Sequence, residues 1–289
     1  MTEGRNLKSP GSESGKSKRT YHRKRYEELT FSDDFMFCKI LENNEELCKE
    51  LIELVLGEKI AIVHNVEKQK AIETSSDNKG VRLDVRVLAD NRIFALEMQN
   101  AKKDNLPRRT RYYQSMVDID ISEHGSDYKN LMDSCIIFIC NFDPFEQNIC
   151  RYTVKPHIEE LPEYEYNDGT VKIFLSATVA NRESSNISEE LQDFLQYVGG
   201  KPPKSDLTKR IQEAIDKSKA EEKWRREYMF LFEIKEEGYV AGKAEGKAEL
   251  IIKMHKNGAS ASSISNLTEI PLKEVLQILD DAQDEQTES

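Results

Sequence analysis

Two runs of alternating apolar and polar residues, 81–88 and 92–99, flank the dipeptide Asp90-Asn91. Branched and aromatic side chains dominate both runs, and alternation with a period of two is typical of a β-strand. Asp and Asn tolerate the positive φ angles of a two-residue turn. The pattern therefore predicts a β-hairpin.

The faces of this hairpin carry polar residues in unusual places. In the first strand, alternation collects four apolar side chains on one face: Val81, Leu83, Val85 and Val87. Asp84 lies on the opposite face. In the second strand, one face combines two apolar and two polar side chains: Ile93, Ala95, Glu97 and Gln99. Since neighbours across a strand pair have Cβ atoms about 5 Å apart, we expect Asp84 to lie close to Glu97 and Gln99.

Two carboxylates this close repel each other unless a positive group lies between them, and a divalent cation is a common solution. Asp84 and Glu97 are therefore candidate ligands of Mg²⁺ or Mn²⁺. Ordinary ion pairs with neighbouring basic side chains are the alternative. Those neighbours are Arg82 and Arg86 for Asp84, and Lys102 and Lys103 for Glu97.

Apolar residues at helical spacing over residues 32–56 predict a helix before the hairpin. Ser32 or Asp33 can cap its start, and Gly57 ends it. The residues that follow, 60–73, have the composition of a first strand.

A basic and aromatic helix is expected over residues 107–121, with a proline in its first turn. Arg109, Arg111 and Tyr112 are candidate DNA contacts, because Arg binds phosphate and Tyr stacks on bases. The alternative is an ordinary solvated helix face.

The run CIIFIC, residues 135–140, is apolar throughout and predicts a strand buried on both faces. A strand, a helix and a second strand in this order form a right-handed parallel crossover. The expected fold is thus α/β, with a restriction-endonuclease-like αβββαβ core around a mixed sheet. Further strands are expected at 149–154 and 171–176, and a further helix at 187–198.

The sequence GGKPPKS, residues 199–205, predicts the main boundary of the chain. Residues 26–200 would form the α/β domain, and residues 201–289 a helical C-terminal region. Three glycines lie at four-residue intervals in that region: Gly238, Gly242 and Gly246. They suit close packing against a second copy, as a homodimer, and the alternative is a flexible helix that frays. Residues 250–279 resemble a small helix-turn-helix, but their flanks are not basic, which favours packing over DNA reading.

The net charge of −11 argues against a protein that coats nucleic acid everywhere, although a nuclease needs only a local basic surface. Residues 1–25 are expected to be a disordered basic tail, since 8 basic against 2 acidic side chains give a local charge of +6. Five cysteines without C-x-x-C spacing indicate reduced thiols in a cytoplasmic protein. The apolar runs are too short to cross a membrane.

Three ordered blocks resemble the recombination-promoting nuclease / putative transposase family of the PD-(D/E)xK nuclease superfamily. The blocks are SDDFMF at residues 32–37, RLDV at 82–85 with EMQ at 97–99, and RTRYYQS at 109–115. The resemblance covers about residues 28–145, and its members share the αβββαβ order.

The resemblance implies that Asp84 and Glu97 hold the metal and that Asp34 approaches it from the first helix. An ordinary helix-start carboxylate is the alternative for Asp34. Gln99 stands where the superfamily has Lys, and Leu83 where it has Pro. Because an amide can orient a water molecule but cannot neutralise charge, more of the catalysis would fall on the metal.

The expected function is therefore that of a metal-dependent DNA endonuclease associated with recombination or transposition, with Asp84, Glu97 and Gln99 as catalytic residues. The alternative on the same fold is a catalytically weak DNA-binding or recombination accessory protein. A helical oligomerisation protein with a degenerate nuclease core is a third interpretation.

Overall fold

The protein is described by a computed structural model that covers residues 24–72, 80–102, 105–121, 127–179 and 187–287. The expected basic tail lies outside the described residues, except for Lys24 and Arg25.

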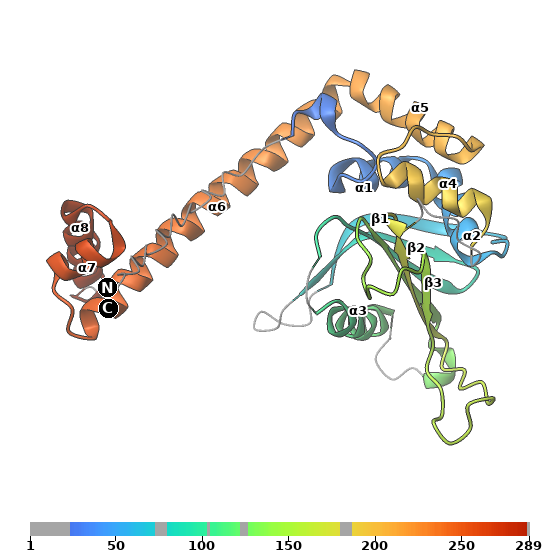
Figure 1. Cartoon of the computed structure of the whole chain (residues 1–289), viewed down its shortest axis with the longest axis horizontal. Helices are drawn as coiled ribbons and strands as arrows, with labels where there is room; N and C mark the ends of the chain where they lie inside the picture. The colour runs from blue at the N-terminus through green and yellow to red at the C-terminus, as the bar shows by residue number, and fades with distance from the viewer. Residues whose placement is uncertain (1–23, 73–79, 103–104, 122–126, 180–186, 288–289) are drawn as a thin grey trace, which may run out of the picture.

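A six-stranded mixed sheet with the strand order β1-β2-β3-β4-β6-β5 forms the centre of the α/β part of the molecule, away from α6, α7 and α8 (Figure 1). The strands are β1 (Val63–Ile72), β2 (Val81–Ala89), β3 (Arg92–Gln99), β4 (Asp133–Cys140), β5 (Arg151–Val154) and β6 (Thr170–Ser176). Strands β1, β2 and β3 are antiparallel, β3, β4 and β6 are parallel, and β5 is antiparallel to β6. The expected α/β fold with a mixed sheet is confirmed.

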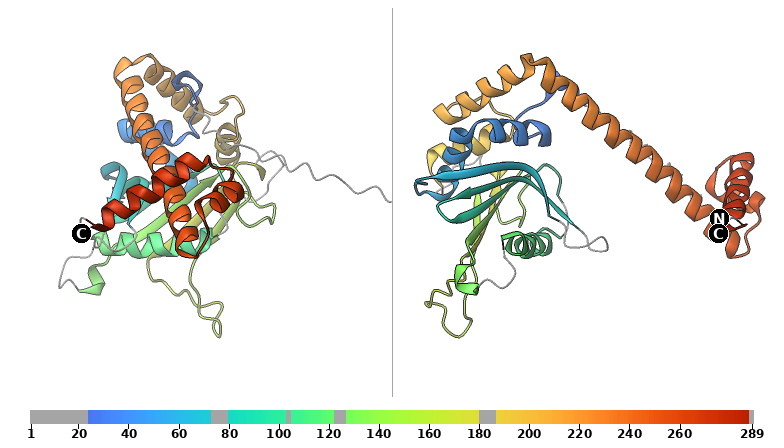
Figure 2. Two further views of the ribbon diagram at one scale, coloured as in Figure 1. Left: turned by 90° about the vertical axis from the view of Figure 1, so that its left-hand side faces the viewer. Right: turned by 180° about the vertical axis from the view of Figure 1, so that it is seen from behind.

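Helices cover both faces of the sheet (Figures 1 and 2). One face is covered by α1 (Asp34–Asn43), α2 (Glu45–Leu56), α4 (Glu189–Val198) and α5 (Asp206–Ala220). The other face is covered by α3 (Leu106–Ile121), which connects β3 to the parallel β4. Two short 3₁₀ helices, η1 (Tyr26–Glu28) and η2 (Tyr128–Asn130), complete this part of the chain.

The β2–β3 hairpin turns where the sequence predicts. Asp90 and Asn91 have φ angles of 47° and 58°, as a two-residue turn of this kind requires. Both carboxylate oxygens of Asp90 also accept bonds from the backbone N–H groups of Ala61 and Ile62, at 2.8 Å each. The turn is therefore fixed by its backbone preference and by its own side chain.

The single helix expected over residues 32–56 is wrong, because the chain forms two helices that meet at Asn44. The side-chain amides of Asn43 and Asn44 donate to the carbonyls of Lys39 and Ile40, at 2.8 Å each. Such side-chain bonds satisfy carbonyls that a continuous helix would have used, so two consecutive asparagines end α1. Gly57 ends α2 as predicted, with a φ of +78°.

The alternation of faces holds for β4 but not for β2. Successive β4 side chains enter opposite cores, as expected for a strand buried on both faces. In β2, Val85 and Val87 pack on the α1 side, whereas Val81 and Leu83 pack on the α3 side. The prediction that all four share one face is wrong, and the change of face occurs at Asp84.

The C-terminal region begins on the core and then leaves it (Figures 1 and 2). Leu207, Ile211 and Ile215 of α5 belong to the main hydrophobic core. The 35-residue helix α6 (Glu222–Lys256) then extends outward to a small cluster formed with α7 (Ala261–Thr268) and α8 (Leu272–Thr287). The division of the chain at residue 200 stays a prediction. The packing of α5 against the main core is relevant to it, because α5 lies after residue 200.

Within the described ranges, no helix combines the length and apolar character needed to span a membrane.

Candidate metal centre

The candidate site lies where strands β2 and β3 separate. Their ladder ends at the pair Val85 and Leu96. Beyond that pair, β3 remains bonded to β4 as far as Gln99, while β2 remains bonded to β1 as far as Val81. The sheet therefore opens into a fork, and Asp84 and Glu97 are the first residues beyond the branch point.

Each of these two carboxylates accepts a bond from the backbone of the opposite strand. Glu97 Oε1 accepts from the N–H of Asp84, and Asp84 Oδ2 accepts from the N–H of Met98, both at 3.0 Å. Side chains thus take over the hydrogen bonds that the ladder no longer makes. The expected proximity of Asp84 and Glu97 is present in the structure.

The two carboxyl groups differ in exposure, since Glu97 is buried and Asp84 is half-buried. Burial raises the pKa of Asp84 to about 6, and the neighbouring charge of Asp34 contributes in the same direction. Burial also raises the pKa of Glu97 well above its ordinary value, and the charge of Asp84 is the second cause of this increase. Glu97 is only 1% exposed. A bound cation would favour the charged forms of both groups.

Helix α1 adds two further side chains to this site. Asp34 and Cys38 are four residues apart, so they lie on the same face of the helix. One ligand atom from each of Asp34, Cys38 and Asp84 lies within 4.8 Å of the other two. Asp34 is therefore close to Asp84, as the sequence led us to expect. Cys38 was missed, although its spacing from Asp34 was a usable signal.

Arg109 points from α3 into the site. Its Nη1 donates to Gln99 Oε1 at 2.5 Å, and its Nη2 lies 3.6 Å from Glu97 Oε2. The guanidinium also lies over the rings of Tyr113 and Phe138, at 5.0 and 5.5 Å from their centroids. These contacts fix Arg109 beside Glu97. Sequence reasoning assigned it to DNA and did not foresee its bond to Gln99.

The amide of Gln99 is engaged at both ends, since its Nε2 donates to the carbonyl of Ala101 at 3.0 Å. One amide hydrogen remains for another acceptor. Arg111 and Tyr112, the other candidate DNA contacts, are exposed on the outer surface of α3. Only Arg109 of these three therefore joins Asp84, Glu97 and Gln99.

The ordinary ion pairs considered for the two carboxylates do not form in the described structure. Arg86 pairs with Glu67 at 2.7 Å and with Asp120 at 3.4 Å, and Arg82 lies 4.0 Å from Asp34. Lys102 pairs with Glu146 instead of Glu97, and Lys103 lies outside the described residues. The two carboxylates are thus brought together without a lysine, and with one arginine beside Glu97.

A family model described as a PD-(D/E)XK nuclease family transposase matches residues 32–228. The chain belongs to this family. The match includes α1, the β2–β3 hairpin and α3, and it extends through α5 into the first part of α6. No curated protein and no solved structure gives a significant match.

Nucleases of the PD-(D/E)XK family generally use divalent metals, and the chemistry of this site fits such an ion. Glu97, which is buried, and Asp84, which is half-buried, offer hard oxygen ligands, and Asp34 offers a carboxylate near Asp84 from the adjacent helix. Within the described residues, the set of three side chains close enough to share one ion is Asp34, Cys38 and Asp84, and Glu97 is not part of it. Burial raises the pKa values of Asp84 and Glu97 even though Arg109 lies 3.6 Å from Glu97, so a bound cation would further favour their charged forms.

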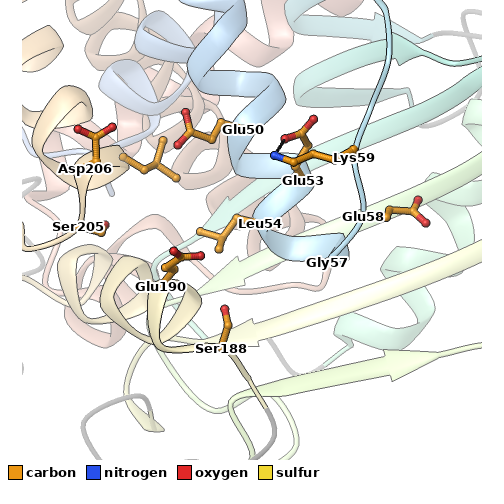
Figure 3. Close-up of a pocket in the computed structure, with 11 residues that line it drawn as sticks. Glu50, Glu53, Leu54, Gly57, Glu58, Lys59, Ser188, Glu190, Ser205 and Asp206 are labelled. Atoms are coloured by element: carbon orange, nitrogen blue, oxygen red, sulfur yellow. Dashed lines mark hydrogen bonds and ion pairs between the residues drawn. The ribbon is translucent and has the colours of Figure 1, made fainter.

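A second hollow of the molecule is also acidic but has a different character (Figure 3). This cavity of about 520 Å³ lies among residues of α2, α4 and α5, including Glu50, Glu53 and Glu190. Glu53 is neutralised by Lys59, at 2.7 Å. In the described part of the chain, its acidic groups do not form a set close enough to share one ion. The fork of the sheet is therefore the better candidate site.

Proposed function

We propose that this nuclease-family protein is a metal-dependent DNA endonuclease that hydrolyses phosphodiester bonds in recombination or transposition. The observation that carries the proposal is the carboxylate pair at the fork, where Glu97 is almost fully buried and Asp84 lies beside it. Such a pair is unfavourable without a cation, and it lies on a fold whose family cleaves nucleic acid.

In this proposal, Asp84 and Glu97 hold Mg²⁺ or Mn²⁺, and Asp34 approaches it from α1. When bound, the ion would lower the pKa of water and stabilise negative charge on the scissile phosphate. The backbone bonds at Asp84 and Met98 hold the two carboxylates in fixed orientations. The chain's own contribution is a preorganised, partly dry set of oxygen ligands.

Gln99 stands where the superfamily has a lysine. We propose that Arg109 supplies the positive charge that this lysine would have provided. Its guanidinium lies 3.6 Å from Glu97 and is bonded to Gln99. Gln99 would then have two tasks, since it positions Arg109 with its oxygen and orients the attacking water with its remaining amide hydrogen. Arg111 and Tyr112, exposed on α3, would contact the DNA strand as it passes the site.

The proposed assembly is a homodimer in the cytoplasm. The middle of α6 supports association with a second copy, because Ile234 and Val240 are 49% and 60% exposed. Apart from the backbone of its own helix, no atom of the described residues lies within 4 Å of a Cβ position at Gly242. The cytoplasmic location is supported by the five cysteines, all of which are free and buried.

The experiment is incubation of the full-length protein with plasmid DNA, with and without Mg²⁺. We expect cleavage that requires Mg²⁺, and loss of cleavage in both Asp84→Ala and Glu97→Ala. Glu213→Gln, which changes an exposed carboxylate of α5, should cleave like the unaltered protein. Equal cleavage by all variants would remove the site assignment.

A DNA mobility-shift assay distinguishes the endonuclease from the alternative function, a catalytically weak DNA-binding or recombination accessory protein. An accessory protein would retard DNA but leave the plasmid intact at every Mg²⁺ concentration. Gln99 in the place of a lysine is the observation that keeps this alternative in view.

A further inference from the structure

Cys38 gives the candidate metal centre a ligand that a magnesium site does not need. It is buried, with 2% of its surface exposed, and lies one helical turn after Asp34 on α1. Its Sγ is 3.9 Å from Asp34 Oδ1. The other oxygen of Asp34 faces two cations, with Arg82 at 4.0 Å and Lys235 at 3.7 Å. Oδ1 is thus the oxygen on the Cys38 side.

The arrangement is close to what one tetrahedral ion requires. The ligand atoms of Asp34, Cys38 and Asp84 all lie within 4.8 Å of one another. Ligands at the usual Zn–O and Zn–S distances of about 2.0–2.3 Å are separated by roughly 3.3–3.8 Å in a tetrahedron. Among the residues that the structure describes, this is the one set of three His, Cys, Asp or Glu side chains so grouped.

The type of donor decides which ion would use this set. Mg²⁺ and Mn²⁺ prefer oxygen ligands, whereas thiolate selects softer ions such as Zn²⁺ and Cd²⁺. Burial raises the pKa of the Cys38 thiol, as do the charges of Asp84 and Asp34. A cysteine binds a metal ion as the thiolate, so binding displaces the proton of the thiol.

We propose that Asp34, Cys38 and Asp84 form a binding site for Zn²⁺ or Cd²⁺ that overlaps the proposed magnesium site through Asp84 and Asp34. Binding breaks the S–H bond of Cys38, forms one metal–sulfur bond and releases one proton to solvent. Because Asp84 cannot serve both ions in the same way, the soft metal inhibits cleavage. The inhibition rests on the proposed nuclease function, whereas the binding does not.

The binding is tested by titrating Cd²⁺ into metal-free, full-length protein and recording the ultraviolet thiolate-to-metal charge-transfer band. We expect the band to saturate at one equivalent per chain. It should be lost in Cys38→Ser and retained in Cys48→Ser, which alters another fully buried thiol on the next helix. A band that survives in Cys38→Ser, or that never forms in the unaltered protein, overturns the proposal.

Asp34→Asn provides a second test that keeps the thiol in place, and it decides the matter if Cys38→Ser does not fold. We expect it to weaken Cd²⁺ binding by roughly tenfold or more, as for loss of a supporting ligand. Unchanged affinity would overturn the proposal.

A third measurement separates this proposal from the nuclease function. Zn²⁺ inhibition is expressed relative to each variant's own rate in Mg²⁺, and Cys38→Ser should need at least roughly tenfold more Zn²⁺ for half-inhibition. Cleavage with equal sensitivity in both proteins would overturn the inhibitory role. Absence of cleavage in the unaltered protein would instead contradict the nuclease function and leave the Cd²⁺ result standing.

Discussion

The fold and the proposed chemistry place opposite requirements on Glu97 and Asp84. The fold uses them as hydrogen-bond acceptors at the fork, while burial disfavours their charged forms. The chemistry needs both charges in order to bind a cation. The metal-free protein is therefore expected to be less stable than variants in which one charge is removed.

The first prediction concerns Asp84→Asn in metal-free buffer. The folded-state pKa of Asp84 is about 6 against an ordinary value of 3.8, so ionisation reduces the stability of the folded protein as the pH rises through this window. The variant should match the unaltered protein near pH 4 and be more stable by a few kcal/mol above pH 6, since one pKa unit corresponds to about 1.4 kcal/mol.

Denaturant unfolding at a series of pH values measures this difference. Glu213→Gln, which alters an exposed carboxylate, serves as the control and should show no such divergence. If the difference in unfolding free energy between Asp84→Asn and the unaltered protein does not change with pH, the raised pKa assigned to Asp84 is contradicted.

The second prediction concerns Gln99 and its bond to Arg109. Gln99→Leu removes both the oxygen that holds Arg109 and the amide hydrogen proposed for water, so cleavage should fall by about 10²-fold or more. Gln99→Lys should remain folded and retain some activity. In Arg109→Met, the further change Gln99→Lys should restore part of the lost rate, because it returns a positive charge to the site. Normal cleavage by Gln99→Leu would contradict both assignments.

At the scale of elements, the hairpin could be predicted because its turn and its periodicity are local properties. The closeness of Asp84 to Glu97 followed from the pairing of adjacent strands. The change of face in β2 could not be predicted, because it arises where β2 leaves β3 while remaining paired with β1. The contact of Arg109 with Glu97 and Gln99 was likewise hidden, since it depends on how α3 packs on the sheet, whereas the four-residue spacing of Cys38 from Asp34 was visible in the sequence.

The third prediction concerns the outer surface of α3. Arg111 is exposed on α3, two residues after Arg109, so Arg111→Ala should weaken DNA binding to all sequences alike and reduce the slope of log K against log salt by about 1. Fluorescence anisotropy with labelled duplexes at several salt concentrations gives both values. Arg226→Ala, which alters an exposed arginine of α6, is the matched control. An unchanged slope in Arg111→Ala would exclude α3 as the phosphate-binding surface.

At the scale of the whole molecule, the packing of α5 and of the start of α6 argues against the domain boundary expected at residue 200. Leu207, Ile211 and Ile215 lie in the main core, and Glu227 at the start of α6 pairs at 2.5 Å with the buried amine of Lys39. The glycines and prolines at 199–205 signal a change of composition. Composition alone could not show that the next helix folds back onto the core.

The fourth prediction compares two fragments. Residues 26–235 keep α5 and the packed start of α6, whereas residues 26–200 lack them and expose the apolar surface that α5 covers. Both contain the sheet, but we expect the longer fragment to unfold cooperatively at a clearly higher temperature. Calorimetry measures the difference. Identical transitions in the two fragments would uphold residue 200 as the domain boundary.

The fifth prediction concerns assembly. If the exposed part of α6 joins two copies, the full chain should sediment as a dimer and residues 26–235 as a monomer. Two linked cores would raise the effective concentration of the second site on a duplex, so the full chain should make more double-strand cuts relative to nicks. A monomeric full chain, or a fragment that is still dimeric, would contradict this role of α6.

The central claim is that Asp84 and Glu97 together hold a divalent ion, and Mn²⁺ binding followed by electron paramagnetic resonance tests it without reliance on cleavage. The spectrum of free Mn²⁺ should diminish as the unaltered protein is added. In Glu97→Gln and Asp84→Asn the affinity should fall by about tenfold or more, while Glu213→Gln should bind as before. Equal Mn²⁺ binding by all four proteins would contradict the claim, because the ion would then occupy some other site.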